Sequence, residues 1–316
     1  MKELSIVIVN WNVRDLLRQC LLSLHQATRT INTEIYVVDN ASTDGSIEMI
    51  RTEFPEVILI ANQKNFWFPK ANNQALRKVK GKYTLLLNPD TTVKEDALVR
   101  LIKFMETHPS VGIDGPKILD SDGRIQYECA RELPTLSGFS FSIIALTRLF
   151  PHHKIFNKEV MGNWDHQTSR FVPAISGACM LIRTKLFKKI DLLDETLPMY
   201  FEDIDLCQRA NQAGAKIYYL SDAEIIHYSG QSTRKHHLTH KIVEAIQFQA
   251  YKRFFTKYRP PLNLLMFYII LITGSSLRVV TIFFTWLFLG LVGKKSDDFS
   301  LETLKKYLIA LKTGLT

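Results

Sequence analysis

The first 120 residues alternate between short runs of consecutive apolar residues and longer segments in which apolar residues recur at helical spacing. LSIVIVN at 4–10 is uninterrupted, as is typical of a strand buried on both faces of a sheet. Residues 14–27 instead carry Leu16, Leu17, Cys20, Leu21 and Leu24, the spacing of a helix with one buried face. The same patterns predict further strands at 34–40, 56–62, 82–88 and 111–119, and further helices at 45–53, 70–79 and 95–107.

This alternation of strands and helices predicts an α/β fold with right-handed βαβ units and a mostly parallel sheet. Ligands of such sheets bind beyond the carboxyl ends of the strands. Polar residues collect at these ends, namely Asn10 and Asn12, Asp39 and Asn40, Asn62 to Asn65, and Asn88 and Asp90. The pattern therefore predicts a ligand site along one edge of the sheet.

The turn after the first strand excludes two common ways of holding a phosphate. NWNVRD contains no glycine, whereas a dinucleotide-binding turn reads G-x-G-x-x-G. The chain also has no G-x-x-x-x-G-K-[ST] motif. If the site binds a phosphate, a metal ion or basic side chains must neutralise the negative charge.

Two acidic residues at strand ends each have a structural and a functional interpretation. Asp39 lies in DNASTDGS, where it could serve as a turn or cap residue, or could accept from a ribose hydroxyl or a base N–H. Asp90 follows Pro89, which has no N–H to donate to a sheet. Asp90 could cap a helix beginning near Lys94, or bind Mg²⁺ or Mn²⁺ with Asn88 beside it.

A third acidic group opens a predicted helix at 202–213, where Glu202, Asp203 and Asp205 follow the aromatic residues of MYF. The helix dipole alone favours acids in a first turn. A carboxylate beside aromatic rings can also have a raised pKa and act as a general base. His227 ends a later apolar run, and the basic Arg234 and Lys235 follow it.

Composition narrows the class of protein. The chain has 316 residues, too many for one small core, and a net charge of +9. Its four cysteines are far apart and form no C-x-x-C pair, which argues against a disulfide framework or a zinc site and fits a reducing compartment. The basic residues concentrate around apolar C-terminal segments, so we expect a membrane surface and not a nucleic acid as the partner.

Two apolar segments, 262–277 and 279–293, flank Arg278. Each is about 24 Å long as a helix, short of the roughly 20 residues that span a bilayer. We expect two helices that lie in one leaflet or form a hairpin, with flanking basic residues at the cytoplasmic face. A buried hairpin at a homodimer interface is the alternative. A final amphipathic helix is predicted at 300–313.

Several motifs, in order, resemble the family 2 glycosyltransferases of the GT-A fold, especially bacterial rhamnosyltransferase-like members. They span about residues 3–235 and read SIVIVNWN, VVDNASTDGS, NFWFPKANN, LLLNPDT, SGACMLIR, MYFEDIDLCQRANQAG and IIHYSGQS. The resemblance implies a GT-A catalytic domain over 1–240, with a nucleotide-sugar-binding half (1–118) and an acceptor-binding and catalytic half (119–240). Residues 241–316 would form the membrane-associated helical region.

The resemblance implies inverting transfer of a sugar, with L-rhamnose favoured by the NPD motif, from a nucleotide-diphosphate donor to a lipid-linked or surface-polysaccharide acceptor. Asp203 matches the catalytic base, with Glu202 beside it, and Asp90 and His227 match ligands of Mg²⁺ or Mn²⁺. The acceptor side would include Ser176, Gly177 and Ala178. Donor-binding positions would be Asn10, Asn12, Asp39, Asn65, Trp67, Lys70, Asn73, Asn88, Arg234 and Lys235.

NFWFPKANN departs from the usual N-x-G-F-x-x-A-N-N of this family, because Trp67 replaces the glycine. Glycine permits positive φ or close backbone approach, which tryptophan adopts only with strain. We therefore expect either a different loop path, with the indole packing on the donor or on a helix, or a narrowed donor pocket. Two other classes of function stay open, a nucleotidyltransferase and a catalytically degenerate nucleotide-sugar-binding protein.

Overall fold

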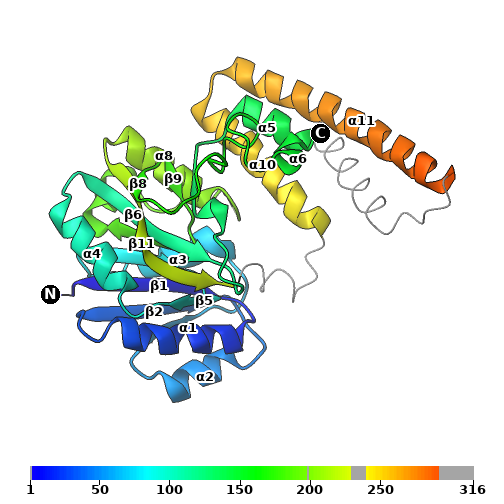
Figure 1. Ribbon diagram of the computed structural model, residues 1–316. Helices are drawn as coiled ribbons and strands as arrows, with labels where there is room; N and C mark the ends of the chain where they lie inside the picture. The colour runs from blue at the N-terminus through cyan, green and yellow to red at the C-terminus, as the bar shows by residue number, and fades with distance from the viewer. Residues whose placement is uncertain (1, 198, 229–239, 292–316) are drawn as a thin grey trace. The chain divides into compact units, whose positions relative to one another are not determined.

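The computed structural model of the chain describes residues 2–197, 199–228 and 240–291 (Figure 1). The chain forms two compact units. The first comprises Met1–Leu133 and Asp165–His236, and the second comprises Pro134–Trp164 and His237–Thr316. The strands belong to the first unit, and the long C-terminal helices belong to the second (Figure 1).

The N-terminal half of the main sheet is parallel, as the alternating pattern predicts. Its strands are ordered β3 (Ile58–Ala61), β2 (Thr33–Asp39), β1 (Leu4–Asn10) and β4 (Tyr83–Leu87). The connecting helices are α1 (Arg14–Ala27), α2 (Ser46–Glu53) and α3 (Trp67–Leu76). Residues of β1 and β2 pair in register from Leu4 with Thr33 to Asn10 with Asp39, so their carboxyl ends meet at one edge.

The second half of the sheet is mixed. Strand β10 (Cys179–Arg183) runs antiparallel between β4 and β6 (Val111–Leu119). Strand β11 (Lys216–His227) is parallel to β6 and antiparallel to β5 (Thr91–Val93) and β8 (Arg170–Phe171). A small second sheet pairs β7 (Ala130–Arg131) with β9 (Ala174–Ile175). The expected α/β class is confirmed, with a sheet that is parallel in its first half and mixed in its second.

Helices cover the sheet. Helix α1 packs against β5, and α4 (Ala97–Thr107) packs against β6 and β11. Helix α1 buries Leu17, Cys20, Leu21 and Leu24, which are residues of its predicted apolar face. Burying one such side chain stabilises the fold by about 1.5–3 kcal/mol. All four cysteines are free and buried, in agreement with the absence of a disulfide framework.

The second unit is helical. It contains α5 (Leu136–Ile143), α6 (Leu146–Leu149), α10 (His240–Tyr258) and α11 (Pro261–Leu291). Its core is a cluster of apolar side chains from α5, α10 and α11, namely Phe139, Ile143, Phe248, Phe255, Phe267 and Leu271. Glu159 joins this unit internally by accepting from Tyr251 Oη at 2.8 Å.

The expectation of two helices on either side of Arg278 is wrong. Helix α11 is continuous over 31 residues, about 46 Å, because no proline interrupts it after its first residue. Gly274 does not end the helix. A Cβ there would lie 2.1 Å from Ile143 Cγ2, so glycine permits close packing against α5. Residues 261–288 are long and apolar enough to cross a membrane, judged by length and composition only. The predicted helix at 300–313 lies outside the described residues.

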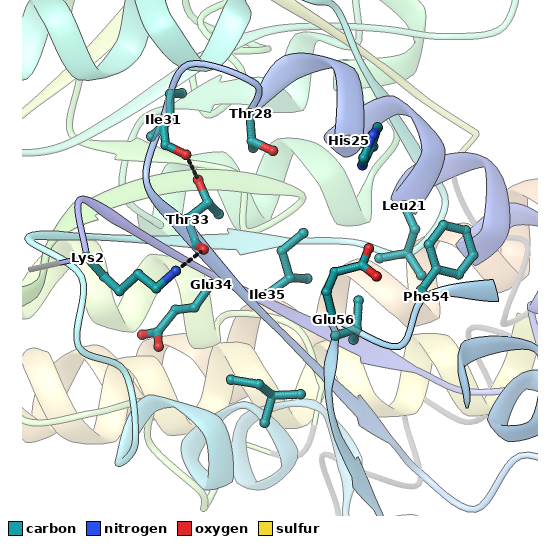
Figure 2. Close-up of a pocket in the computed structure, with 12 residues that line it drawn as sticks. Lys2, Leu21, His25, Thr28, Ile31, Thr33, Glu34, Ile35, Phe54 and Glu56 are labelled. Carbon is teal, nitrogen blue, oxygen red and sulfur yellow. Dashed lines mark hydrogen bonds between the residues drawn. The ribbon is translucent and has the colours of Figure 1, made fainter. Parts of the chain in front are cut away.

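The first unit also contains a cavity of about 350 Å³ at the amino ends of β2 and β3 (Figure 2). Lys2, His25, Glu34 and Glu56 contribute charged or polar groups to its lining. The cavity lies near Thr33 and Ile58, where these strands begin, whereas the predicted site residues follow the strands' carboxyl ends. It is therefore separate from the site described next.

Candidate active site

Asn10 and Asp39 join the carboxyl ends of β1 and β2. Asn10 Nδ2 donates to Asp39 Oδ2 at 2.8 Å, and the backbone N–H of Ser42 donates to Asp39 Oδ1 at 2.8 Å. Both Asn10 and Asp39 are fully buried. Within the described residues, the buried Asn10 Oδ1 has no hydrogen-bond partner. Asp39 thus supports the loops from beneath, and the edge retains an unused buried acceptor.

Asn12 connects the same two loops closer to the surface. Its backbone N–H donates to Ser42 Oγ at 2.9 Å, and its Oδ1 accepts from the backbone N–H of Thr43 at 2.6 Å. The loops after β1 and β2 therefore form one hydrogen-bonded unit.

Backbone strain collects along this edge. Asn12, Ala41 and Trp67 follow β1, β2 and β3, and have φ angles of 54°, 64° and 64°. A non-glycine residue in the left-handed region costs about 1–2 kcal/mol, and such strain concentrates at functional sites. Tyr200 and Phe201, directly before the acidic helix, are also left-handed, with φ angles of 65° and 67°.

Trp67 adopts the backbone conformation that glycine would favour. The backbone N–H of Trp67 donates to Asn65 Oδ1 at 2.7 Å, and its backbone carbonyl accepts from Asn40 Nδ2 at 3.3 Å. The Trp67 residue is 43% exposed. Lys70 Nζ lies 5.2 Å from the ring centroid of Phe66 in the same loop. The loop is held in a left-handed turn that leaves the indole open to solvent.

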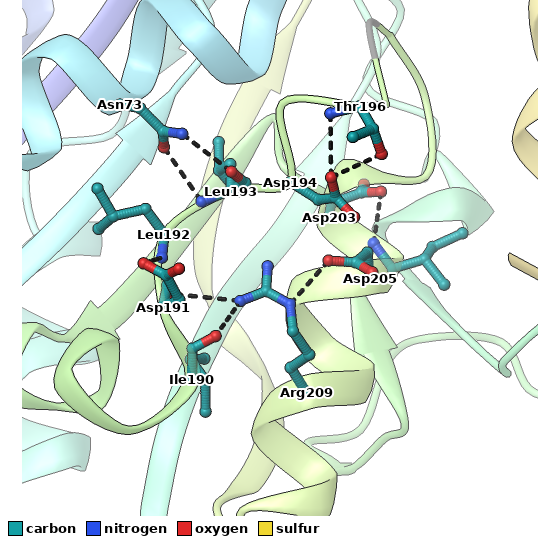
Figure 3. A network of polar contacts seen from close by, with 11 residues as sticks. Asn73, Ile190, Asp191, Leu192, Leu193, Asp194, Thr196, Asp203, Asp205 and Arg209 are labelled. Atoms are coloured by element: carbon teal, nitrogen blue, oxygen red, sulfur yellow. Dashed lines mark hydrogen bonds and ion pairs between the residues drawn. The ribbon is translucent and has the colours of Figure 1, made fainter. Parts of the chain in front are cut away.

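Asn73 lies deeper than the sequence indicated. It is buried, and its side chain pairs with the backbone of Leu193, donating to the carbonyl at 2.9 Å and accepting from the N–H at 3.1 Å (Figure 3). Arg209 approaches the same segment from α8 (Glu202–Gln212). It donates to the carbonyls of Ile190 and Asp191 and pairs with Asp205 Oδ2 at 2.8 Å. The segment 190–193 is thus held between α3 and α8.

Asp90 and His227 meet at the ends of β4 and β11. His227 Nε2 lies 3.3 Å from Asp90 Oδ1 and 3.2 Å from Asn88 Nδ2. Asp90 is buried and does not cap a helix, because β5 follows it and α4 begins only at Ala97. The sheet therefore brings together the two side chains that the resemblance implies as metal ligands.

These two side chains fit a Mg²⁺ or Mn²⁺ ion. Such ions bind through one or two protein ligands and complete an octahedron with water and substrate phosphates. Neighbouring ligands about 2.1 Å from an octahedral ion are about 3 Å apart, close to the separation of Asp90 Oδ1 and His227 Nε2. In the part of the chain that the structure describes, no group of three His, Cys, Asp or Glu side chains could hold a metal by itself.

Asp203 lies at the start of α8 and contacts the predicted acceptor side. Its Oδ2 accepts from the backbone N–H of Gly177 at 2.9 Å, and its Oδ1 accepts from that of Ile204 at 2.8 Å. Ala178 N donates to Ser176 Oγ at 3.2 Å, and the Ala178 carbonyl accepts from the N–H of Asn88 at 3.0 Å. Residues 176–178 therefore link Asp203 to the strand end that carries Asn88.

Glu202 has a different environment from Asp203. Burial, and next the neighbouring Asp203 carboxylate, raise the pKa of Glu202 to about 8. Glu202 Oε2 has no hydrogen-bond partner among the described residues. At neutral pH Glu202 is therefore mainly protonated, and a protonated carboxyl cannot take a proton from a substrate.

Two predicted residues and one unpredicted residue complete the description. Arg234 and Lys235 lie outside the described residues. Gln126, which the sequence did not single out, contacts His227 twice. Gln126 Nε2 donates to the backbone carbonyl of His227 at 2.7 Å, and Gln126 Oε1 lies 3.0 Å from His227 Nδ1. No spacing signal marks Gln126, because it lies in the irregular polar segment DSDGRIQYEC.

Several known proteins with similar sequences are sugar transferases. The family model described as glycosyl transferase family 2 matches residues 5–191. The N-acetylglucosaminyl-diphospho-decaprenol L-rhamnosyltransferase of Mycobacterium tuberculosis is 27% identical over 250 residues, which cover 75% of this chain and 80% of that protein. Rhamnosyltransferase WbbL of Escherichia coli K12 is 30% identical over 178 residues, covering 54% of this chain and 63% of that protein.

Solved structures show the same fold. Mannosyltransferase PcManGT from Pyrobaculum calidifontis, in complex with GDP-Man and Mn²⁺, has a TM-score of 0.54 at 15% identity over 98% of this chain and 86% of that one. GalNAc-T7 with UDP, GalNAc and Mn²⁺ has a TM-score of 0.54 at 18% identity, over 82% of this chain and 52% of that one. The fold and the family expected from the motifs are thus confirmed, and the family model covers more than half of the chain. The chain belongs to glycosyl transferase family 2.

Proposed function

We propose that this protein transfers a sugar, L-rhamnose in the first instance, from a nucleotide-diphosphate donor to a hydroxyl of a lipid-linked or cell-surface polysaccharide acceptor, with inversion. One observation carries the proposal. The Asp90–His227 pair and Asp203 are linked through residues 176–178, since Ala178 bonds to Asn88 and Gly177 bonds to Asp203. A pair that can hold a cation and a carboxylate that can take a proton therefore belong to one connected site.

Asp203 would act as the general base. It removes the proton of the acceptor hydroxyl as that oxygen attacks the anomeric carbon. The new bond joins the acceptor oxygen to this carbon, and the bond from the carbon to the donor's phosphate oxygen breaks on the opposite face. A single displacement of this kind inverts the configuration and requires no second catalytic carboxylate, unlike a hydrolytic pair.

The leaving group is a nucleoside diphosphate. Asp90 and His227 would hold Mg²⁺ or Mn²⁺, which neutralises the charge on the diphosphate when it is bound. Arg234 and Lys235 would add charge-assisted hydrogen bonds to the same phosphates. Pairing by Asn88 would keep His227 beside Asp90 before the donor arrives.

The donor would lie along the strained edge. Asp39 would form the floor of the nucleoside pocket and hold Asn10 in place beneath it. The wall of the pocket would consist of Asn12, Asn65, Trp67 and Lys70, and Asn73 would support it from within α3.

The second unit supports a membrane-linked acceptor. Exposed apolar side chains lie along α11, including Phe283, Phe284, Trp286 and Phe288. The M. tuberculosis relative is named for a decaprenol-linked acceptor. We infer that α11 associates with the cytoplasmic face of the membrane, near which a lipid-linked acceptor is presented.

A donor screen tests the proposal. The purified protein is incubated with several nucleotide-sugars, with Mn²⁺ or Mg²⁺ and with a decaprenol-linked acceptor, and released nucleoside diphosphate is measured. Asp203→Asn should abolish release, since the amide has no basic oxygen, while nucleotide binding persists. Asp191→Asn is the control, because the exposed carboxylate of Asp191 lies on the turn directly after Ile190, and this variant should turn over normally. Chelation by EDTA should stop release, and added Mn²⁺ should restore it. Normal turnover by Asp203→Asn would exclude Asp203 as the base.

A further inference from the structure

We propose that Gln126 is a positioning residue, one that holds His227 in the tautomer whose Nε2 lone pair faces Asp90. This proposal deepens the proposed cation site and rests on it for its functional meaning. It concerns a residue 101 positions before His227 in the chain, with which it makes a two-point contact.

Backbone contacts hold Gln126 in position, independently of its side chain. The isolated bridge between Leu119 and Ile125 closes the turn at the end of β6. The N–H of Gln126 then donates to the carbonyl of Ile118 at 2.9 Å. Gln126 thus extends from the end of a central strand toward β11, where His227 is the last residue.

The two side-chain contacts determine which ring nitrogen carries the proton. Gln126 Nε2 donates to the backbone carbonyl of His227 at 2.7 Å, a contact that only the amide nitrogen can make. The amide oxygen therefore faces His227 Nδ1 at 3.0 Å and acts only as an acceptor. Nδ1 must donate, and in a neutral imidazole Nε2 then has a lone pair.

This tautomer leaves Nε2 ready to bind a cation. Nε2 lies 3.3 Å from Asp90 Oδ1, so two electron-pair donors face each other, with Asn88 Nδ2 as a weak compensating donor at 3.2 Å. In the other tautomer, Nε2–H would donate to Asp90 and the two ligands would satisfy each other. Gln126 prevents that pairing, and so keeps the lone pair of Nε2 as the group that would join Asp90 Oδ1 as neighbouring ligands of one ion.

The tautomer can be observed without any donor or metal. In protein labelled with ¹⁵N-histidine, long-range ¹H–¹⁵N correlation at pH 8 distinguishes Nδ1–H from Nε2–H, and the spectrum of His227→Gln assigns the signal of His227. The wild-type ring should be the Nδ1–H tautomer. Gln126→Leu should shift the ring mainly to Nε2–H. Gln126→Glu keeps an acceptor for Nδ1 and should retain the wild-type tautomer.

Cation affinity gives the second readout. Mn²⁺ is titrated into the same samples, and the concentration that half-broadens the His227 signal is measured. Gln126→Leu should need about 10–100-fold more Mn²⁺, the usual effect of losing a residue that orients a metal ligand, and Gln126→Glu should stay near wild type. Circular dichroism verifies the folding of each variant, and Gln126→Met replaces Gln126→Leu if the latter is unfolded.

A wild-type Nε2–H tautomer, or an unchanged tautomer and Mn²⁺ midpoint in Gln126→Leu, would overturn the proposal. If these results are as expected but the wild-type protein consumes no nucleotide-sugar, the proposed function fails while the role of Gln126 stands.

Discussion

Asn73 and Leu193 share a pair of hydrogen bonds across 120 positions of the chain, one from the amide of Asn73 to the carbonyl of Leu193 and one from the N–H of Leu193 to the Asn73 oxygen. This pairing fixes the segment before α8 against α3. Asn73→Ala should therefore leave two buried backbone groups unpaired and reduce the free energy of unfolding by about 1–3 kcal/mol. Thermal unfolding should show a Tm lower by about 3–10 °C.

Arg77→Ala is the matched control for Asn73→Ala. Arg77 lies one helical turn away and also contacts this segment, through a 3.0 Å ion pair with Glu195. That pair is largely solvent-exposed and should contribute only about 0–1 kcal/mol. Equal losses of Tm in the two variants would contradict the structural role of Asn73.

The raised pKa of Glu202 predicts that its contribution to the free energy of unfolding decreases as pH rises. Below the unfolded-state pKa, 4.5, the carboxyl is protonated in both states. Between 4.5 and about 8 it ionises in the unfolded chain but stays protonated in the buried native site, so the native state loses relative stability. Glu202→Gln removes this penalty. Its Tm should exceed that of the wild type by an amount that grows from pH 5 to pH 8.

Glu195→Gln should have the opposite effect. Hydrogen bonds from Asn73 and then Arg77 lower the pKa of Glu195, so its stabilising contribution is present above 4.5 and is lost as pH falls. At pH 7 this variant should be less stable than the wild type.

Stability curves for Glu202→Gln and wild type that run parallel across pH 5–8 would contradict the prediction for Glu202, because they would show that Glu202 ionises normally.

Two substitutions at Trp67 distinguish the effect of the indole ring from the effect of the backbone conformation. Trp67→Gly and Trp67→Ala both remove the exposed indole, but only glycine relieves the positive φ of 64°. If the indole stacks on the donor, both variants should bind the nucleotide about 5–10-fold more weakly, from a loss of about 1 kcal/mol of aromatic contact. Trp67→Gly should be the more stable of the two by about 1 kcal/mol. Unchanged donor affinity in a calorimetric titration would mean that the indole only packs against the protein.

The exposed apolar side chains of α11 predict binding to vesicles. Phe284 and Phe288 are 60% and 65% exposed, so replacing both by Glu should release the protein from anionic phospholipid vesicles without unfolding it. Leu149→Glu is the control, since Leu149 is 67% exposed in the same unit but lies on α6. Flotation measures the bound fraction. Release by the control variant alone would assign the membrane contact to α6.

Local patterns predicted the N-terminal half of the fold because its elements are neighbours in both sequence and space. Helix α1 was found at 14–27 from the spacing of its own apolar residues. Strand β10 was not, because its place is decided by β4 and β6, which lie roughly 70–95 residues earlier. The same holds for Gln126, whose partner is 101 residues away.

Two features of the structure depend on more than the residue type at one position. Arg278 was expected to divide the C-terminal region, yet the continuity of a helix depends on backbone hydrogen bonds, which arginine does not interrupt. Trp67 was expected to force a different loop path or to narrow the donor pocket, yet the backbone there adopts the left-handed conformation that glycine favours, despite the large side chain. Neither outcome can be read from the residue type alone.

Strand β10 also affects how the chain is made. It lies between β4 and β6, which are synthesised earlier, and pairs antiparallel with both of them. A nascent chain that ends before residue 179 therefore presents β4 as an open apolar edge, the kind of edge that pairs with other chains. The proposed cation site and the proposed base also depend on residues that are synthesised later, His227 and Asp203. Protection from aggregation during synthesis is thus needed most in the interval between the emergence of β4 and that of β10.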